Sequence, residues 1–510
     1  MSIRVYPVVN TELFCDDYKV RVNGISAETN VARVSAVPFC RRWPGHQRSI
    51  DQTELIQFLS FSMDEPVRIE ITPTDKFDPK DLKIRPQSLG ITPEIVNGVI
   101  SFTLDKPAYV SVEPFGRNRA FHIFADSPCD FGIDKASENV IYYGAGEHEV
   151  GLITLHSGET LFIDEGAVVY GRVEAIDADN IRIIGHGILD NSRTKETILF
   201  EARAEDNHVE IKNAKRENSI KLEYCNNVLI DGITMRDSLI YNIRPYATNG
   251  IEIRNVKIIG CWRYNSDGID MHNCIDVHID NCFIRTFDDA ICVKGFDCYY
   301  DGDVEAAVHA AMYRGGKAYD VFKNVLIENC VVWNDWGKGL EIGAETRAEE
   351  ISDVTFRNCD LIHVMHAPLD SMNVDFADTH DITFENITVE MDENIPQPRI
   401  QIRDSEPYEA LEDNYKPFAV SLTVEFHFEY SAGGARRGKN RNYSFKNVNF
   451  LCDKPLKMRF AGYDEIHKTE NVSFEGIKQN GKSVTSIAPE NLVIKDFVEN
   501  VRFVDGDIIK

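Results

Sequence analysis

Three polar clusters between residues 265 and 343 contain the side chains whose types and spacing could carry out chemistry. They are Asn265–Asp270 (Asn-Ser-Asp-Gly-Ile-Asp), Phe287–Lys294 (Phe-Asp-Asp-Ala-Ile-Cys-Val-Lys) and Trp336–Gly343 (Trp-Gly-Lys-Gly-Leu-Glu-Ile-Gly). Carboxylates gathered in one place repel one another, and this repulsion raises the pKa of at least one of them. A group in which one carboxyl stays protonated while another is ionised is suited to general acid–base catalysis.

The spacing of the clusters is that of successive turns of a repetitive structure. Asp289 lies 22 residues after Asp267, and Lys338 lies 49 residues after Asp289. A non-repetitive stretch of about 25 residues, Phe296 to Asp320, separates the second cluster from the third, and without it all three are about one repeat apart. Neighbouring parallel strands lie ~4.8 Å apart, so we expect the carboxylates of adjacent repeats to share one site.

The elements that position these clusters share a short phrase, an alternating strand followed by Asn or Gly. Its copies are Val228–Gly232, Ile251–Asn255, Val277–Asn281, Val325–Asn329, Val354–Asn358 and Ile382–Asn386, with further copies at Tyr443–Asn447 and Val472–Gly476. The first positions of the first six copies are separated by 23, 26, 48, 29 and 28 residues. We interpret the interval of 48 as two periods of roughly 25 residues.

This period suits either a leucine-rich repeat or a β-solenoid. The units lack the leucine-rich consensus and have no helical segment. The sequence therefore predicts an all-β protein, with a right-handed parallel β-helix over residues 139–510. Asparagines at the repeated turn are expected to stack into a hydrogen-bonded ladder, which is a structural role.

Residues 1–138 differ from the rest and predict a separate domain. Val20–Gly24, Val67–Ile71 and Val110–Glu113 indicate antiparallel strands joined by loops with Pro and Gly, and we interpret them as an N-terminal β-sandwich. Two insertions interrupt the helix, at about 296–320 and 396–440. The first looks helical from Asp303 to Met312, and the second runs into a basic segment, Arg436–Arg441. Insertions in a solenoid tend to form the walls of its cleft.

The composition of the chain argues against two classes of binding partner. The 510 residues are 43% hydrophobic and 27% charged, with a formal net charge of -27, which argues against nucleic acid and anionic membrane surfaces. No window is long and apolar enough for a signal peptide or a membrane span. We therefore expect a cytoplasmic protein, or a secreted one if a leader was trimmed before residue 1. The 12 cysteines form no CxxC pair, and four follow asparagine as small buried side chains, so reduced thiols are expected.

The order of Asn-Ser-Asp-Gly, Asp-Asp and Gly-Lys-Gly-Leu-Glu-Ile-Gly along a parallel β-helix resembles the polygalacturonase clan of glycoside hydrolases. That clan contains the family 28 pectinases and the family 49 dextranases and isopullulanases, and the N-terminal sandwich is similar to family 49. The resemblance covers roughly residues 141 to 390, and Ser157–Gly171 is similar to the opening coil. It implies hydrolysis of glycosidic bonds with inversion, without metal or cofactor. By motif, Asp288 would be the general acid, while Asp267 and Asp289 would activate the attacking water.

Physical chemistry is compatible with those roles. An inverting enzyme needs about 6.5–9.5 Å between acid and base so that a water fits between them. The competing interpretation is that Ser-Asp-Gly and Asp-Asp are ordinary turn sequences. Asp270 is left out of the predicted site, because an offset of three from Asp267 gives it the opposite direction in a regular strand.

Departures from the pectinase pattern indicate the substrate. Lys338 stands where pectinases have the histidine of Gly-His-Gly, and residues 362–368 lack the Arg-Ile-Lys motif that grips galacturonate. A neutral or weakly charged glycan is therefore expected, for example an α-glucan such as dextran. The residues predicted to contact this substrate are Lys338, Glu341, Asn242, Arg244, His366, Trp262 and Trp336. Each of these contacts has an alternative structural interpretation. The tryptophans could instead pack in the core, His366 could be a structural histidine, and Lys338 could form an ion pair with Glu341.

The sequence is also compatible with three other functional classes. The first is a polygalacturonase that acts on uronic acids. A β-helix polysaccharide lyase, which would use Ca²⁺ and a basic residue such as Lys338, is another. The third is a non-catalytic carbohydrate-binding β-helix. The fold by itself does not choose among them, and the sequence leaves endo or exo cleavage and homo-oligomerisation undetermined.

Overall fold

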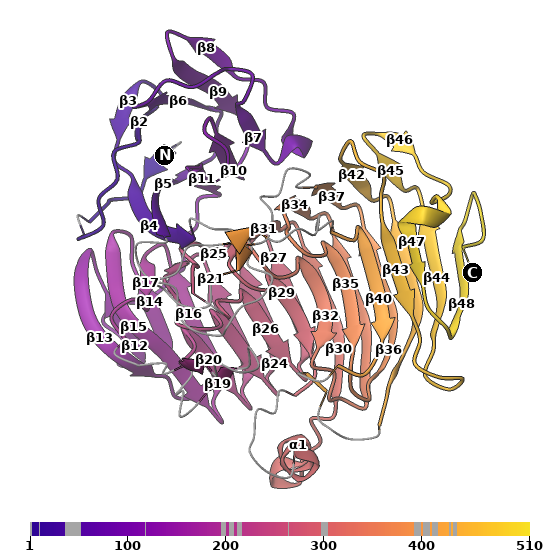
Figure 1. The fold of residues 1–510 in the computed structure, drawn as a ribbon. Helices are drawn as coiled ribbons and strands as arrows, with labels where there is room; N and C mark the ends of the chain where they lie inside the picture. Colours follow the sequence, from indigo (N-terminus) through magenta and orange to yellow (C-terminus); the bar gives the residue numbers. More distant parts are fainter. Residues whose placement is uncertain are drawn as a thin grey trace.

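The computed structural model shows a long β-helix with a second β domain packed against one side of it (Figure 1). The structure describes residues 3–9, 11–35, 53–117, 119–194, 200–202, 209–211, 217–263, 265–296, 304–391, 399–400, 409–410, 417–427, 430–431 and 436–509. Among these residues, no helix has the length and apolar character needed to cross a lipid bilayer.

The N-terminal domain consists of two sheets that enclose one apolar core. The first sheet contains β1 (Ile3–Val5), β4 (Asn30–Ser35), β5 (Thr53–Met63), β7 (Lys83–Arg85), β10 (Ala108–Glu113) and β11 (Phe121–Asp126). The second contains β2 (Tyr18–Val22), β3 (Ile25–Ala27), β6 (Val67–Pro73), β8 (Glu94–Val96) and β9 (Val99–Leu104). Alternate residues of strands such as β2 and β6 point inward, and Phe61, Ile69 and Phe102 meet in the shared core. This arrangement is a β-sandwich.

The β-helix begins after the sandwich and has three faces, which the chain visits in the order A, B, C. Face A contains β12 (Val140–Tyr143), β14 (Thr160–Ile163), β16 (Asp179–Gly185), β21 (Asn226–Asp231), β24 (Asn249–Arg254), β27 (Ile275–Asp280), β30 (Val321–Glu328), β33 (Glu350–Arg357), β36 (Asp378–Glu385), β41 (Lys439–Lys446), β44 (Thr469–Glu475) and β48 (Val498–Phe503). All of its strands are parallel.

Faces B and C are rows of one larger sheet. Face B contains β17 (Ile188–Asp190), β22 (Thr234–Arg236), β25 (Lys257–Ile258), β28 (Phe283–Thr286), β31 (Val331–Asn334), β34 (Asp360–His363), β37 (Thr388–Glu390) and β42 (Asn449–Leu451). Face C contains β20 (Ile220–Glu223), β23 (Ile243–Tyr246), β26 (Ile269–His272), β29 (Ile291–Lys294), β32 (Leu340–Ala344), β35 (Leu369–Asn373), β40 (Val420–Val424) and β43 (Met458–Ala461). The long strand β15 (Ala167–Ile176) pairs with β13 (Gly146–Thr154) before it and with both β17 and β20 after it.

The repeated phrase in the sequence forms face A. The strands pair with the first positions of the phrase opposite one another, so that Val228, Ile251 and Val277 are neighbours. Val277 in turn pairs directly with Val325, so the interval of 48 residues is one coil plus an insertion and not two periods. The right-handed parallel β-helix predicted from the repeat is confirmed.

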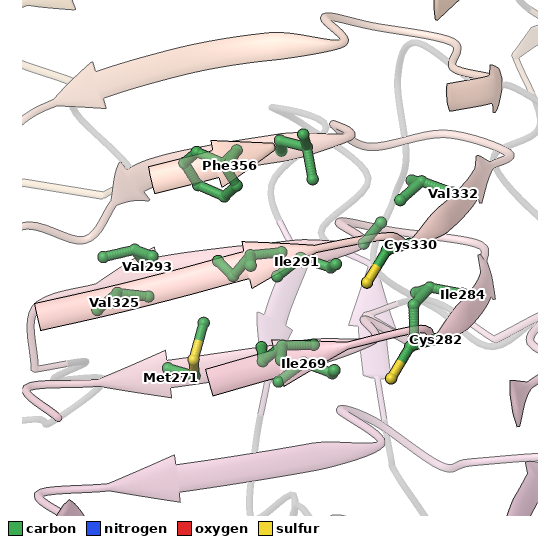
Figure 2. Close-up of a cluster of buried hydrophobic side chains, with 14 of the residues drawn as sticks. Ile269, Met271, Cys282, Ile284, Ile291, Val293, Val325, Cys330, Val332 and Phe356 are labelled. Carbon is green, nitrogen blue, oxygen red and sulfur yellow. The ribbon is translucent and has the colours of Figure 1, made fainter. Parts of the chain in front are cut away.

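Apolar residues fill the interior of the helix without a break. Figure 2 shows Ile269, Ile291, Ile284 and Val332 pointing inward from neighbouring coils. Phenylalanines at the same register of face A stack in a column, with ring centroids 4.8 Å apart for Phe356 and Phe384 and 4.9 Å for Phe384 and Phe445. Alignment of like side chains on successive coils therefore stabilises the solenoid.

Asparagines that follow several of the face A strands form the expected ladder. The Asn386 amide donates to the Asn358 Oδ1 at 3.2 Å, and Asn447 donates to the Asn386 Oδ1 at 3.2 Å. Asn386 has a φ of 54°, in the left-handed region that Asn tolerates better than most residues. The following residue is a buried cysteine in several coils, as in Asn281-Cys282, Asn329-Cys330 and Asn358-Cys359, and these thiols are free.

Replacing Asn386 by Ala is expected to lower the free energy of unfolding by about 1–2 kcal/mol, because Ala loses both ladder hydrogen bonds and strains a positive φ. Asn386→Gly serves as the control, since Gly loses the same hydrogen bonds without the backbone strain. Denaturant unfolding of the two variants separates the contributions. Equal destabilisation by Ala and Gly would show that the backbone conformation contributes nothing.

The first insertion carries helix α1 (Val304–Met312), which projects below the coils in Figure 1 and packs Val308 and Met312 against Ala247 and Phe296. It matches the predicted helical segment. Most of the second insertion lies outside the described residues. The basic segment that follows it is paired locally, since Arg436 contacts Glu349 at 2.8 Å and Arg441 contacts Asp378 at 2.9 Å. These pairs give the described part of the basic segment a structural role.

The sandwich packs on face B through an apolar cluster and several buried polar contacts. Phe58 and Phe124 of the sandwich share a cluster with Phe283 and Trp333 of the helix. The polar contacts across the interface are Lys257 with Asp126, Arg285 with His122, His363 with Glu113, Arg85 with Glu390, and Arg117 with Asp335. Buried charges are retained only where they are paired, so the two domains are closely fitted.

Candidate active site

The three polar clusters lie in the turns that join face B to face C, and these turns stack in register. Gly268 N donates to the Asp289 carbonyl at 2.9 Å, and Ala290 N donates to the Lys338 carbonyl at 2.9 Å. Asp267, Asp289 and Lys338 therefore occupy equivalent positions on three successive coils. Gly337 permits this approach, because a Cβ atom there would lie 2.4 Å from the Asp289 Oδ1.

Local hydrogen bonds hold the Asp288–Asp289 turn. The Asp288 Oδ1 accepts from the Asp289 backbone N–H at 3.0 Å, and its Oδ2 accepts from the Asn265 amide at 3.2 Å. The Asp289 Oδ1 accepts from the Lys338 backbone N–H at 2.8 Å. The Asn334 amide donates to the Asp288 carbonyl from face B. Both carboxylates thus have fixed orientations before any ligand binds.

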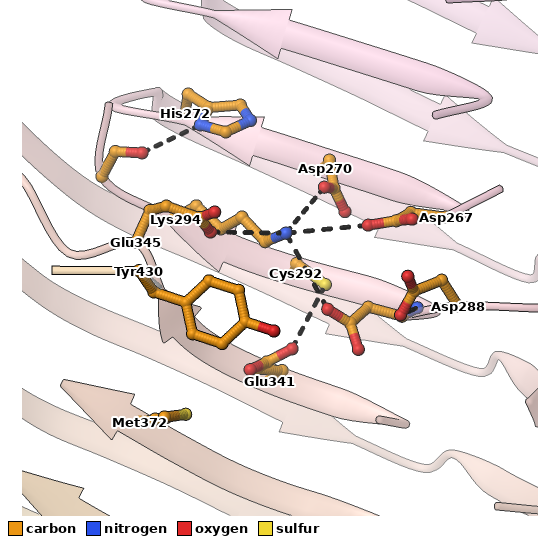
Figure 3. Close-up of polar contacts among 12 residues, drawn as sticks. Asp267, Asp270, His272, Asp288, Cys292, Lys294, Glu341, Glu345, Met372 and Tyr430 are labelled. Carbon is orange, nitrogen blue, oxygen red and sulfur yellow. Dashed lines mark hydrogen bonds and ion pairs between the residues drawn. The ribbon is translucent and has the colours of Figure 1, made fainter. Parts of the chain in front are cut away.

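Lys294 is a buried cation at the centre of the site. Its Nζ lies 2.8 Å from Asp270, 3.6 Å from Glu345, 3.7 Å from Asp267 and 3.9 Å from Asp289. Figure 3 shows the ammonium group between Asp267, Asp270 and Glu345. One ammonium group thus joins carboxylates from three successive coils.

Lys338 forms a second cationic centre on the next coil. Its Nζ contacts Glu341 and lies 2.9 Å from Asp370. Glu341 and Asp370 are opposite each other on β32 and β35. The ion pair between Lys338 and Glu341, expected as one alternative, is present.

Burial and mutual repulsion shift the ionisation of these groups. Burial, reinforced by Asp270 and Asp288, raises the pKa of Asp267 well above its ordinary value. Burial and the neighbouring Asp289 raise the pKa of Asp288 well above its ordinary value. Burial and the charge of Asp289 likewise raise the pKa of Glu341. These shifts favour the protonated form of at least one carboxyl group, so the site can supply an acid as well as a base.

Two of the predicted substrate contacts lie beside this centre. His366 is in the next B–C turn, and burial together with the charge of Lys338 lowers its pKa to about 3, so its imidazole is uncharged at neutral pH. Trp336 is half-buried and stacks on Phe287, with ring centroids 6.0 Å apart.

The other three predicted contacts are engaged with the protein. Asn242 is fully buried, and its amide donates to the Asp267 carbonyl at 2.8 Å. Trp262 is buried and donates to Asp237 at 3.0 Å, which favours packing over sugar stacking. Arg244 lies on β23, where it contacts Glu223 at 3.2 Å and covers the ring of Tyr246. Asn242 thus positions the turn that carries Asp267.

Four charged residues of this site were not among the predicted contacts, namely Lys294, Asp270, Glu345 and Asp370. Asp270 was excluded on the premise that Asp267 lies in a regular strand. Asp267 instead lies in the turn before β26, so both side chains reach Lys294. The available signal was Lys294 itself, a lysine at the end of the apolar strand Ile291–Lys294.

Asp289, Cys292 and Glu341 are the one group of potential metal ligands found in the described part of the chain, with ligand atoms within 4.8 Å of one another. Hard cations such as Ca²⁺ prefer six to eight oxygen ligands, whereas this group includes a thiol. Burial raises the pKa of the Cys292 thiol well above its ordinary value, which opposes the thiolate that softer metals require. The group does not fit the Ca²⁺ site of a lyase.

Comparison with known proteins agrees with this geometry. The sequence model of the glycosyl hydrolases family 28 matches residues 164–402, a range that contains all three clusters. A probable polygalacturonase from Vitis vinifera is 33% identical over 82 residues, 16% of this chain and 17% of that protein. A polygalacturonase from Brassica napus is 26% identical over 147 residues, 28% of this chain and 30% of that protein. The chain spans less than a third of the length of these curated relatives.

A solved structure shows the same fold over nearly the whole chain. Dex49A from Penicillium minioluteum has a TM-score of 0.57, covers 97% of this chain and 98% of its own, and is 15% identical. The family 28 match and this shared fold support the polygalacturonase-like clan of parallel β-helix glycoside hydrolases. Within that clan, its matched region is that of family 28. The resemblance inferred from the sequence is confirmed.

Proposed function

We propose that this protein is an inverting glycoside hydrolase that cleaves a neutral or weakly charged oligosaccharide or polysaccharide. The observation that carries the proposal is the convergence of Asp267, Asp288 and Asp289 in adjacent turns. Asp267 and Asp289 lie 3.7 Å and 3.9 Å from a buried ammonium group, and Asp288 is held by the Asp289 N–H. Protonated and ionised carboxyl groups side by side are what glycosidic cleavage requires.

In this proposal Asp288 donates a proton to the glycosidic oxygen. Its raised pKa keeps a proton available at neutral pH. Asp267 and Asp289 accept a proton from the water that attacks the anomeric carbon from the opposite face. Lys338, His366 and Trp336 lie where they would bind sugar hydroxyls and the ring face.

The charge of the site supports a neutral substrate. Seven carboxyl groups surround the two buried lysines, and these are Asp267, Asp270, Asp288, Asp289, Glu341, Glu345 and Asp370. Both lysines are already paired, and His366 is uncharged at neutral pH. Within the part of the site that the structure describes, a substrate carboxylate would meet this repulsion, and both buried lysines are already paired.

A polygalacturonase is the second candidate, because the curated relatives that match parts of the chain carry that name. The two candidates make opposite predictions. Neutral gluco-oligosaccharides are expected to give a kcat/KM at least about tenfold higher than oligogalacturonides at low ionic strength, and added salt should raise the activity on oligogalacturonides by screening repulsion. A preference for oligogalacturonides that weakens with salt would favour the second candidate.

Product analysis tests the reaction type. Proton NMR of the first-formed reducing end should show inverted anomeric configuration, and EDTA should leave the rate unchanged. An unsaturated, ultraviolet-absorbing product that disappears with EDTA would instead identify a lyase. Binding of glycans without turnover would support the non-catalytic alternative.

A further inference from the structure

We propose that Lys294 is a positioning residue that decides which carboxylates act as the base, by joining Asp267 and Asp289 to one buried ammonium group and leaving Asp288 outside. This inference rests on the proposed hydrolase function. It adds a residue that the motif comparison did not supply and explains how three adjacent aspartates take different roles.

Lys294 contacts two of the three aspartates and not the third, as this role requires. The Lys294 Nζ lies 3.7 Å from Asp267 and 3.9 Å from Asp289, whereas it makes no ion pair with Asp288 within the described chain. Since Coulomb attraction falls with distance and strengthens in a buried site, the ammonium acts most strongly on the carboxyl groups that it contacts, and it acts on Asp288 from a longer distance. It therefore opposes the rise in pKa that burial gives Asp267, and the proton retained by the cluster is directed to Asp288.

Asp270 and Glu345 hold the ammonium in place. Asp270 has the shortest contact with it, 2.8 Å, and comes from β26, while Glu345 follows β32 on the far side at 3.6 Å. Register supports the arrangement, because Asp270 is opposite Cys292 and so adjoins the strand that carries Lys294. Asp270 and Glu345 are neither the acid nor the base in the proposed mechanism, so they affect catalysis by positioning Lys294.

A thiol and two phenols also face Lys294. Burial raises the pKa of the Cys292 thiol and of the Tyr241 phenol, whose ring centroid lies 5.4 Å from the Nζ. Tyr430 faces the same space in Figure 3 as another phenol.

Four carboxyl groups contact the ammonium, those of Asp267, Asp270, Asp289 and Glu345, and those of Asp288 and Glu341 interact with it from further away. Asp270 and Glu345 contribute most to raising the pKa of Lys294 above its ordinary value, which outweighs the cost of its burial.

Two substitutions are expected to shift the pH profile in opposite directions. Lys294→Met keeps the side-chain length and removes the charge, so the base carboxylates gain protons more readily. The acidic limb of kcat/KM should move to higher pH by about one unit or more, and kcat at neutral pH should fall by about 10- to 100-fold with little change in KM. Asp270→Asn removes a charge that raises the pKa of Asp267, so the limb should move to lower pH.

Lys257→Met is the matched control. Lys257 is also a buried lysine with one close carboxylate, Asp126 at 2.6 Å, but it lies at the domain interface. This variant should lose stability without a shift of the pH profile. A purely structural role for Lys294 would make Lys294→Met behave like Lys257→Met, and that result would overturn the inference.

The experiment distinguishes failure of the role proposed for Lys294 from failure of the proposed hydrolase function. Turnover by the wild type with an unchanged profile in Lys294→Met would overturn the role of Lys294 alone. Absence of turnover by the wild type on every glycan would overturn the hydrolase proposal. In that case a pH titration of the carboxyl infrared bands, comparing wild type with Lys294→Met, tests the lysine directly, and identical titrations would overturn its role.

Discussion

Replacing Asp288 by Asn should lower kcat by about 10²- to 10⁴-fold while the protein stays folded, because the variant loses the proton that the proposed mechanism gives to the leaving oxygen. The asparagine oxygen can still accept the hydrogen bond from the Asp289 backbone N–H, whereas the hydrogen bond from the Asn265 amide to the second carboxylate oxygen is lost. Because the turn keeps its backbone hydrogen bonds, the fold is expected to survive and the loss to be chemical.

The size of the loss should depend on the leaving group. An activated aryl glycoside needs little protonation, so Asp288→Asn should retain much more of its activity on that substrate than on a natural glycan. Steady-state kinetics on both substrates, with circular dichroism to verify folding, measures this difference. Asp353→Asn is the control, since Asp353 is exposed on strand β33 of face A, with a φ of 53° that Asn tolerates. Equal losses on both substrates would contradict the acid role of Asp288.

Replacing Glu113 by Gln is expected to lower the free energy of unfolding by about 3–5 kcal/mol, the cost of breaking a buried ion pair from one side. The Glu113 carboxylate lies 3.0 Å from the His363 Nε2 and 3.2 Å from the Arg85 Nε, and it is buried between the sandwich and face B. Gln removes the charge and leaves both partners buried. Denaturant unfolding monitored by tryptophan fluorescence measures the change.

The contribution of Glu113 to the free energy of unfolding should depend on pH. His363 and Arg85 outweigh the cost of burial and hold the pKa of Glu113 below its ordinary value. A carboxyl group with a lowered pKa stabilises the fold above its unfolded pKa, and this contribution is lost as the pH falls toward the folded value. The difference between wild type and Glu113→Gln should therefore be largest near neutral pH and shrink on acidification.

Glu94→Gln is the control for the interface. Glu94 pairs with Arg68 at 3.2 Å on the sandwich surface and is mostly exposed, so its loss should cost less than about 1 kcal/mol. Similar costs for Glu113→Gln and Glu94→Gln would show that the buried pair does not hold the domains together.

The sandwich also reaches the turns that carry the site. Arg117 contacts Asp335 and lies 3.0 Å from the Met365 Sδ, next to the turn with Trp336 and the turn with His366. The sequence offered no signal for this contact, because Arg117 and Asp335 are 218 residues apart and belong to different domains. These contacts give the N-terminal domain a part in supporting the turns that carry the site.

By itself, the sequence determined the β-helix and the location of its site. A strand repeat fixes which residues face inward, since side chains alternate along a strand, and stacking of equal coils then brings Asp267, Asp289 and Lys338 together. Asn and Gly at the turns added the ladder, because few other residues accept a positive φ. These properties are local or periodic, and periodicity is visible in one dimension.

Tertiary structure decided the electrostatics of the site and the fit of the domains. The direction of the Asp267 side chain depends on whether the residue lies in a strand or in the turn before it. Because it lies in the turn, Asp267 and Asp270 both face the site. The partners of Lys294 come from three coils, and burial of Asn242 turned a predicted sugar contact into a support for Asp267. Side-chain direction, burial and contacts between distant segments depend on packing in three dimensions, which a repeat pattern does not contain.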